Sequence, residues 1–406
     1  MPISPPIPDP ADDSLAGSSF AAGSLTAVAR LAFRLGCTAF GGPAAHIGML
    51  HDEVVRRRHW FTNAHFLDML GATNLIPGPN STEMVMHIGM ERAGWHGLVA
   101  AGLLFIMPAS AITLALAWLY VRYGATPAAE WLLYGVKPVV IAIIAQAVWA
   151  LGHAAITSRA LAVVALAALA LSLAGVNELV VLLGAGAIVA LAETARRRSA
   201  VPPATSLAIW PLAHLDTFTP VLLAAAQPYD PLQLFLRFLK IGATLFGSGY
   251  VLLAFVQQDF VDRLGWLTER QLLDAVAVGQ FTPGPVSSTA TFVGYLVGGW
   301  PGAVLATIGI FLPAFLLVGF THALIPRIRT TPIAAGFLDG VNAAAIALMV
   351  AVAWAIGRAA VIDELTAALA TIAVVLLLRF RVNSAVLIVL GAAAGLLARG
   401  LSGWLG

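Results

Sequence analysis

The sequence contains two Pro-Gly-Pro turns, and each is followed by residues with hydroxyl groups. Two prolines around a glycine remove backbone donors, so a helix ends before the turn and a new one begins after it. The free amides and the positive dipole end of a helix N-terminus favour an anion. The two turns therefore predict an oxyanion site built from Pro77, Gly78, Pro79, Asn80, Ser81 and Thr82 in the first copy and from Pro283, Gly284, Pro285, Ser287, Ser288 and Thr289 in the second.

Polar residues on both sides of each turn extend this prediction. Asn80 or Ser81 is the expected cap of the helix after the first turn. Asn74 and Gln280 precede their turns by three residues, and their amides could donate to an oxyanion or satisfy carbonyls freed by the broken helix. A structural interpretation of both turns also stands, in which they are kinks packed against glycine-rich neighbours, as small residues allow in membranes.

Arg34 and Lys240 occupy equivalent positions, each shortly before a Phe-Gly pair. A cation inside an apolar segment is costly unless it pairs with another group or serves a substrate. Two related cations would neutralise a dianion, which makes both candidates for the anion site; alternatively, Arg34 reaches an interface or holds a carboxylate. Lys137 has Asn342 as its counterpart, so it either breaks the symmetry of the site or reaches lipid headgroups.

Three carboxylates, Glu83, Glu53 and Asp68, are candidates for proton coupling. A carboxylate beside an anion site repels the substrate when ionised and admits it when protonated, which couples a proton to transport. Glu53 and Asp68 have acidic counterparts in the second copy, Asp259 and Asp274. Glu83 has no such counterpart and could instead close a capping box on the new helix.

The turns belong to an internal repeat, which must be found before the elements are assigned. Pro77 and Pro283 differ by 206 positions, and 14 of the 51 residues of 33–83 are identical to those 206 positions later. After a slip of one residue the match continues, with GVKPVV from 135 facing GVNAAA from 340. The predicted organisation is an N-terminal tail at 1–21, a first repeat at 22–195, a linker at 196–230 and a second repeat at 231–406.

The composition places these repeats in a membrane. Of 406 residues, 60% are hydrophobic and 10% are charged, whereas soluble domains are about a quarter charged. The formal net charge of +2, in short basic clusters, does not indicate a nucleic-acid partner. One cysteine, Cys37, excludes a disulfide framework, and no motif of a metal site, a nucleotide-binding loop or a catalytic centre is present. We therefore expect no cofactor, no metal and no enzymatic activity.

Each half has six apolar segments, the first of them near 22–42, and the second segment of each half carries the Pro-Gly-Pro turn. If that broken segment enters and leaves on one side, the basic clusters fall on one face, as the positive-inside rule requires. The predicted fold is an all-α polytopic membrane protein of two homologous inverted repeats, with about ten crossings and two re-entrant hairpins. Twelve straight helices in two parallel repeats are the alternative. Thr62 and Thr268 are expected helix caps before the hairpins, with Gln271 completing a capping box on Thr268.

The two blocks that begin FGGPAAHIGMLHDEVVRRRHWF and FGSGYVLLAFVQQDFVDRLGWL and run through the turns resemble the signature blocks of the chromate ion transporter family, in its long, two-domain form. The resemblance implies a carrier in the bacterial inner membrane that exports chromate, with sulfate as a similar dianion, driven by the proton motive force. The residues alone indicate a carrier, with inverted repeats and broken helices around an anion site at mid-depth. A sulfate or broader oxyanion transporter and an anion channel are the alternatives. The oligomeric state stays open, with a homodimer as one alternative, although each half looks too small to enclose a site alone.

Overall fold

The computed structural model describes residues 24–73, 76–198, 228–246, 249–321, 332–380 and 382–405. Within these ranges the chain forms helices joined by short turns, and it contains no strand. The predicted N-terminal tail, Asn74 and most of the predicted linker lie outside the described residues. The described part therefore consists of the two predicted repeats, which are called the N-terminal and C-terminal halves below.

The N-terminal half begins with two short helices and ends with long ones. Its elements are α1 (Leu25–Thr38), α2 (Gly42–His51), the π-helix η2 (Asp52–Arg57), α3 (Asn63–Thr73), α4 (Asn80–Tyr123), α5 (Pro127–Ala155), α6 (Arg159–Leu173) and α7 (Glu178–Arg198).

The C-terminal half repeats this order, including a π-helix at the equivalent place. Its elements are α8 (Pro231–Thr244), the 3-10 helix η3 (Gly249–Val251), α9 (Leu252–Val256), the π-helix η4 (Gln257–Arg263), α10 (Glu269–Phe281), the 3-10 helix η5 (Val286–Ser288), α11 (Thr289–Thr321), α13 (Pro332–Ala360), α14 (Glu364–Phe380) and α15 (Ser384–Leu405).

Each half begins with short helices, and the chain turns between them. α1 has 14 residues, about 21 Å at 1.5 Å per residue, which is too short to cross a hydrocarbon core of about 30 Å. The chain turns after Thr38, and Leu50 of α2 packs beside Val28 and Leu31 of α1. The structure thus differs from the single continuous segment expected at 22–42. It adds a second hairpin beside the predicted one, which α3 and the start of α4 form.

The two longest helical elements are helical hairpins. Non-helical backbone interrupts α4 at Ala93 and Gly94 and α11 at Gly298 and Gly299, and the chain reverses there. A Cβ atom on Gly89 would lie 2.3 Å from the carbonyl oxygen of Gly97, and one on Gly294 would lie 2.3 Å from that of Gly302. At each turn the second non-helical residue is a glycine with a positive φ angle. Among the described residues, five helices are long and apolar enough to cross a membrane: α4, α5, α7, α11 with its preceding 3-10 turn, and α13. The chain is therefore an all-α polytopic membrane protein, and the predicted number of about ten crossings stays a prediction.

The second arms of the α4 and α11 hairpins run antiparallel, which makes the two repeats inverted. Trp95, just after the turn of α4, contacts Phe320 at the end of α11, with ring centroids 6.1 Å apart. Tyr120, near the end of α4, contacts Phe292 in the first arm of α11, at 5.3 Å. The hairpin turns of the two halves consequently lie toward opposite ends of the α4–α11 pair, as the predicted inverted arrangement requires.

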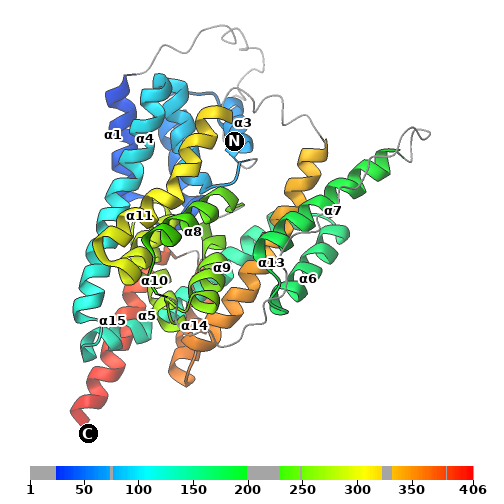
Figure 1. The fold of residues 1–406 in the computed structure, drawn as a ribbon. Coiled ribbons are helices and arrows are strands. Elements are labelled where there is room, and N and C mark those ends of the chain that lie inside the picture. Colours follow the sequence, from blue (N-terminus) through cyan, green and yellow to red (C-terminus); the bar gives the residue numbers. More distant parts are fainter. Residues whose placement is uncertain are drawn as a thin grey trace, which may run out of the picture.

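The last helix of each half packs against a helix of the other half. α7 of the N-terminal half packs along α13, and α15 of the C-terminal half packs along α5. Glycines permit both approaches, because a Cβ atom on Gly135 of α5 would collide with Gly391 and Gly395 of α15. Figure 1 shows α1 and α4 side by side along one edge, α6 and α7 at the opposite edge, and α8 to α11 between them. The largest buried cluster spans both halves and surrounds α8, α10 and α13.

Candidate functional site

Each Pro-Gly-Pro turn donates one backbone hydrogen bond to a carbonyl oxygen of the opposite half. The amide of Gly78 donates to the carbonyl oxygen of Leu245 at 2.7 Å, and the amide of Gly284 donates to that of Ala39 at 2.8 Å. The offset from Gly78 to Gly284 is 206, and so is that from Ala39 to Leu245. One contact is therefore the inverted copy of the other, and the two turns lie where the repeats interlock.

The sequence explains why the bonds form at these atoms. A Pro-Gly-Pro turn has one amide donor, that of its glycine, because proline has none. α1 ends at Thr38 and α8 at Thr244, so the carbonyls just past both ends have no partner within their helices. The carbonyl oxygen of Ala39 also lies 3.1 Å from Nε2 of His46, a side chain buried in α2. Each turn thus donates a hydrogen bond to a carbonyl of the other half that has no partner within its own helix.

Close packing fixes the backbone around the turns. Gly36 lies against Phe105, whose carbonyl oxygen would be 2.6 Å from an added Cβ atom. Gly242 lies in the same way against Ile310. Gly284 has a φ of +88° and would place a Cβ atom 2.7 Å from that of Ala109. The structural interpretation of the turns therefore accounts for their glycines and for the way the hairpins meet α4 and α11.

The helices after the turns begin differently from the prediction. The residue that caps α4 is Pro79, whose carbonyl oxygen accepts the amides of Thr82 and Glu83. The expected capping by Asn80 or Ser81 is therefore wrong, and so is the capping box of Glu83. In the C-terminal half Pro285 caps a 3-10 turn that leads into α11. A proline carbonyl closes the first helical turn in each case, so the polar side chains behind it are not used for capping.

Several of these side chains are buried without a hydrogen-bond partner among the described residues. The atoms are Oγ1 of Thr82, both carboxyl oxygens of Glu83, Nε2 of Gln280 and Oγ of Ser287. All four residues are 7% exposed or less. The carboxyl group of Glu83 lies over the first turn, since a Cβ atom on Gly78 would collide with its Oε1. Buried polar atoms without partners are uncommon and costly, and they mark places where a ligand or water supplies the missing bond.

Two of the remaining predicted donors, Ser288 and Thr289, have partners. Ser288 accepts a bond from Thr113 at 3.3 Å, and Thr289 donates to the carbonyl oxygen of Val286 at 2.8 Å. Oε1 of Gln280 accepts from the Tyr250 hydroxyl at 3.2 Å. Ser81 is buried in the first turn of α4.

The predicted cations Arg34 and Lys240 form ion pairs with carboxylates. Nη1 of Arg34 lies 2.9 Å from Oε1 of Glu53, and Lys240 is bonded to the equivalent residue, Asp259, in the C-terminal half. Lys240 also contacts Glu178 of α7 at 3.1 Å. The structure thus realises the alternative in which Arg34 holds a carboxylate. Each cation lies five residues before the residue whose carbonyl oxygen accepts the bond from a turn, Ala39 or Leu245. Five residues span about 7.5 Å at helical rise.

The equivalent acidic residues Asp68 and Asp274 differ in their surroundings, because Asp274 is buried and Asp68 is exposed. Asp274 is 1% exposed; it accepts a bond from the Tyr120 hydroxyl at 2.8 Å and forms an ion pair with Lys137 at 2.8 Å. Asp68, its counterpart, lies on the exposed side of α3. Lys137, whose counterpart Asn342 is uncharged, therefore forms a buried ion pair inside the protein, and its predicted role in the anion site stays a prediction.

Sequence reasoning missed Thr113, Tyr250 and Tyr120. The residue 205 positions after Thr113 is Val318, and the residue 206 positions before Tyr250 is Ala44. Because these polar residues occur in one half only, comparing the repeats could not select them. The signal that remained was a lone hydroxyl within an apolar run, which is common in membrane helices and carries little specificity.

Known proteins identify the family. The sequence model of the chromate transporter family matches the chain twice, at residues 26–191 and 232–396. The chain belongs to the chromate transporter family. It is 33% identical over 394 residues to a chromate transport protein of Cupriavidus metallidurans, covering 95% of this chain and 96% of that one. It is also 32% identical to a probable chromate transport protein of Synechococcus elongatus, covering 87% and 89% of the two chains.

A third relative is a chromate transport protein of Pseudomonas aeruginosa, 34% identical over 326 residues, covering 78% of this chain and 77% of that one. No solved structure matches the chain significantly. The matches agree with the resemblance drawn from the signature blocks, and they describe a family of transporters rather than enzymes. Within the described residues no group of three or more His, Cys, Asp or Glu side chains could hold a metal ion.

Proposed function

We propose that this protein is a secondary transporter that exports chromate across the bacterial inner membrane by alternating access, coupled to protons. The proposal rests on the reciprocal hydrogen bonds that the two Pro-Gly-Pro turns donate to the carbonyl oxygens of Leu245 and Ala39. Inverted repeats with broken helices at their interface are a transporter architecture, in which an anion binds between half-helix ends. The three relatives named above are chromate transport proteins, which supports chromate as the substrate.

The substrate site in this proposal lies at the two turns. The unpartnered hydroxyls of Thr82 and Ser287 and the amide of Gln280 donate to the oxygens of a tetrahedral dianion. Their burial makes each such bond strong, because the alternative is a polar group without a partner. The rest of the binding set is Asn74, Pro77, Gly78, Pro79, Asn80, Ser81, Pro283, Gly284, Pro285, Ser288 and Thr289.

Arg34 and Lys240 supply positive charge to this site from a distance. Their carboxylate partners hold them on α1 and α8, one on each side of the interlocked turns. The N-terminal cluster contains three arginines around Glu53, namely Arg34, Arg57 and Arg58. The C-terminal cluster likewise holds more cations than anions, so both sides of the site are positive overall.

Glu83 is the proton carrier in this proposal. It is fully buried, and its two carboxyl oxygens have no partner among the described residues. An unpaired buried carboxyl group is tolerated as the neutral acid and is costly as the anion. An ionised Glu83 beside the turn would repel a dianion, so loading the substrate requires the proton. Of the other candidates, Glu53 is held by three arginines, and Asp68 is exposed.

Flux measurements in everted membrane vesicles test the proposal. We expect chromate to accumulate when a proton gradient is imposed and to stop accumulating when the gradient is collapsed. Arg34→Ala should remove this uptake and leave folded protein in the membrane, while Arg159→Gln, which removes an exposed cation at the start of α6, should leave it unchanged. Sulfate uptake without chromate uptake would identify sulfate as the substrate in place of chromate. Flux that never raises the internal concentration above equilibrium would indicate a channel.

A further inference from the structure

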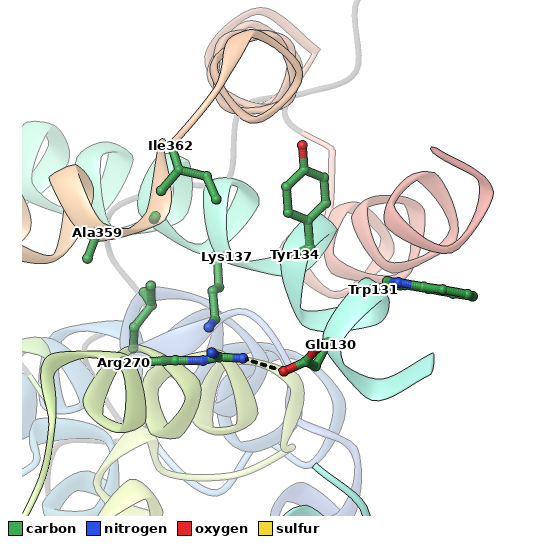
Figure 2. Close-up of a pocket in the computed structure, with 9 residues that line it drawn as sticks. Glu130, Trp131, Tyr134, Lys137, Arg270, Ala359 and Ile362 are labelled. Carbon is green, nitrogen blue, oxygen red and sulfur yellow. Dashed lines mark hydrogen bonds and ion pairs between the residues drawn. The ribbon is translucent and has the colours of Figure 1, made fainter. Parts of the chain in front are cut away.

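A cavity of about 460 Å³ lies at the end of α10 that is remote from the Pro-Gly-Pro turns. α5 contributes Glu130, Trp131, Tyr134 and Lys137, α10 contributes Arg270 and Leu273, and the end of α13 with the next connection contributes Ala359, Ala360 and Ile362. Figure 2 shows Lys137 and Arg270 reaching toward each other from α5 and α10. Two cations from different helices therefore converge on one hollow.

Both cations already hold carboxylates, but the two pairs differ in strength. Arg270 lies 3.1 Å from Glu130, and both side chains are about half exposed, at 63% and 49%. Exposed pairs of this kind contribute little and exchange readily. Lys137 is 13% exposed and Asp274 is 1% exposed, so that pair is shielded from water. An incoming anion could displace Glu130 easily, whereas Asp274 competes for Lys137 as long as it is ionised.

The surroundings of Asp274 contain few other charges. The groups that face it are the Tyr120 hydroxyl of α4 and Lys137 of α5. Arg270 and its partner Glu130 stand at the mouth of the cavity, and Asp363 accepts a bond from the Tyr134 hydroxyl at 2.6 Å. α13 contributes Ala359 and Ala360, and α11 contacts Tyr120 through Phe292.

α10 connects this cavity to the second turn. Gln280, whose amide is part of the proposed central site, follows Arg270 by ten residues on the same helix, about 15 Å at helical rise. The inverted counterpart of this cavity lacks the same chemistry, because Ala64, Asp68 and Asn342 stand where Arg270, Asp274 and Lys137 stand here. The cavity thus distinguishes one end of the molecule from the other.

We propose that this cavity is an outer oxyanion site, in which Lys137 and Arg270 bind a tetrahedral dianion and Asp274 competes with that anion for Lys137. The anion displaces Glu130 from Arg270 and shares Lys137 with Asp274. The inference rests on the proposed transport of oxyanions, since it adds a second position on their route.

Thiol labelling tests the outer site without requiring flux. Cys37 is the chain's one cysteine, so Cys37→Ser provides a thiol-free background, and Ala359→Cys then places a single thiol in the cavity wall. The full-length protein in phosphatidylcholine vesicles is labelled with an anionic methanethiosulfonate. Sulfate is the competing probe, because chromate oxidises thiols. We expect saturating sulfate to slow labelling about tenfold.

Variants separate the roles of the three residues. Lys137→Gln and Arg270→Gln should each weaken the protection by sulfate, and Lys137→Arg should retain it, which guards against a folding defect. Asp274→Asn should strengthen the protection, because the competitor for Lys137 is gone. Arg159→Gln, remote from the cavity, should behave as the background protein does.

Three results would overturn the outer site. The first is labelling that sulfate never slows, and the second is equal protection in the background protein and in Lys137→Gln. The third is protection by phosphatidylglycerol in the vesicles with none by sulfate, which would assign the cavity to a lipid headgroup. Chromate flux without sulfate protection would remove the outer site alone, whereas protection without any flux would remove the proposed transport function and keep the site.

Discussion

Lys240 on α8 is bonded to Glu178, the first residue of α7, so a carboxylate of the N-terminal half holds a cation of the C-terminal half. Glu178 is 2% exposed, and Arg263 approaches its other oxygen at 3.8 Å. The equivalent cation Arg34 pairs with Glu53 of its own half, and its side chain is 56% exposed. Two cations that are equivalent in the sequence therefore differ in the structure, because one of them ties the halves together.

This difference predicts unequal effects on stability. Glu178→Gln leaves Lys240 with one carboxylate fewer in a buried cluster, and breaking such a pair costs about 3 kcal/mol. Arg34→Gln breaks an exposed pair and should cost about 1 kcal/mol or less. Unfolding of the two variants in the same detergent, followed by circular dichroism, compares them. A larger loss for Arg34→Gln than for Glu178→Gln would contradict the assignment.

Glu83→Gln should uncouple transport from protons. The amide has the shape of the neutral acid, so we expect the protein to fold and to bind oxyanion without the proton that the wild type requires. Chromate flux in vesicles should then lose its dependence on the proton gradient and on external pH. Glu53→Gln is the comparison, since it removes an ion-paired carboxylate elsewhere. If gradient-dependent accumulation survives in Glu83→Gln, another group carries the proton.

Gly284→Ala should disrupt the interlocking of the turns. Gly284 and Gly175 both have a positive φ angle, +88° and +80°, which costs about 1 kcal/mol or more for an L-residue. Only at Gly284 does the added Cβ atom also meet a neighbour, Ala109, whereas nothing lies within 4 Å at Gly175. We expect Gly175→Ala to transport normally and Gly284→Ala to lose both thermal stability and flux. Equal behaviour of the two variants would mean that the packing of the turn is unimportant.

Gly36→Ala and Gly48→Ala form a second matched pair. An added Cβ atom on Gly36 meets the backbone of Phe105, which cannot move aside, whereas Gly48 faces open space. Replacing glycine by alanine within a helix otherwise stabilises by about 0.5–1 kcal/mol. Gly48→Ala should therefore raise the midpoint of thermal unfolding, and Gly36→Ala should lower it and separate α1 from α4. The opposite order would show that the α1–α4 contact is loose.

Much of the fold follows from the sequence because the repeat is visible in it. The shared offset predicts that Pro77 and Pro283 occupy equivalent places, and the structure confirms this through reciprocal bonds of their turns. The capping box of Thr268 and Gln271 is confirmed as well, and Thr62 accepts the amide of His65 at 3.2 Å. These features depend on neighbours within a few residues, which is the range over which a sequence pattern is informative.

Features that depend on distant neighbours were beyond such reasoning. Apolarity alone does not tell a helix that crosses a membrane from two short helices that fold back, so the sequence predicts one span across the break after Thr38. Residue preference favours Asn80 or Ser81 as the cap of α4, but the proline before them takes that position. No sequence pattern indicates Glu178, because its partner Lys240 lies 62 residues away and in the other half.

The inverted contacts at Gly78 and Gly284 have a thermodynamic consequence. If each half adopted the conformation of the other, nearly every backbone contact would be re-formed with the roles exchanged, and the resulting state would face the opposite way at a similar energy. The energy difference between two such states then comes from residues without a twin, such as Glu83, Lys137 and Tyr120. Substitutions at positions that differ between the halves therefore shift the balance between the two states and leave the backbone as it is.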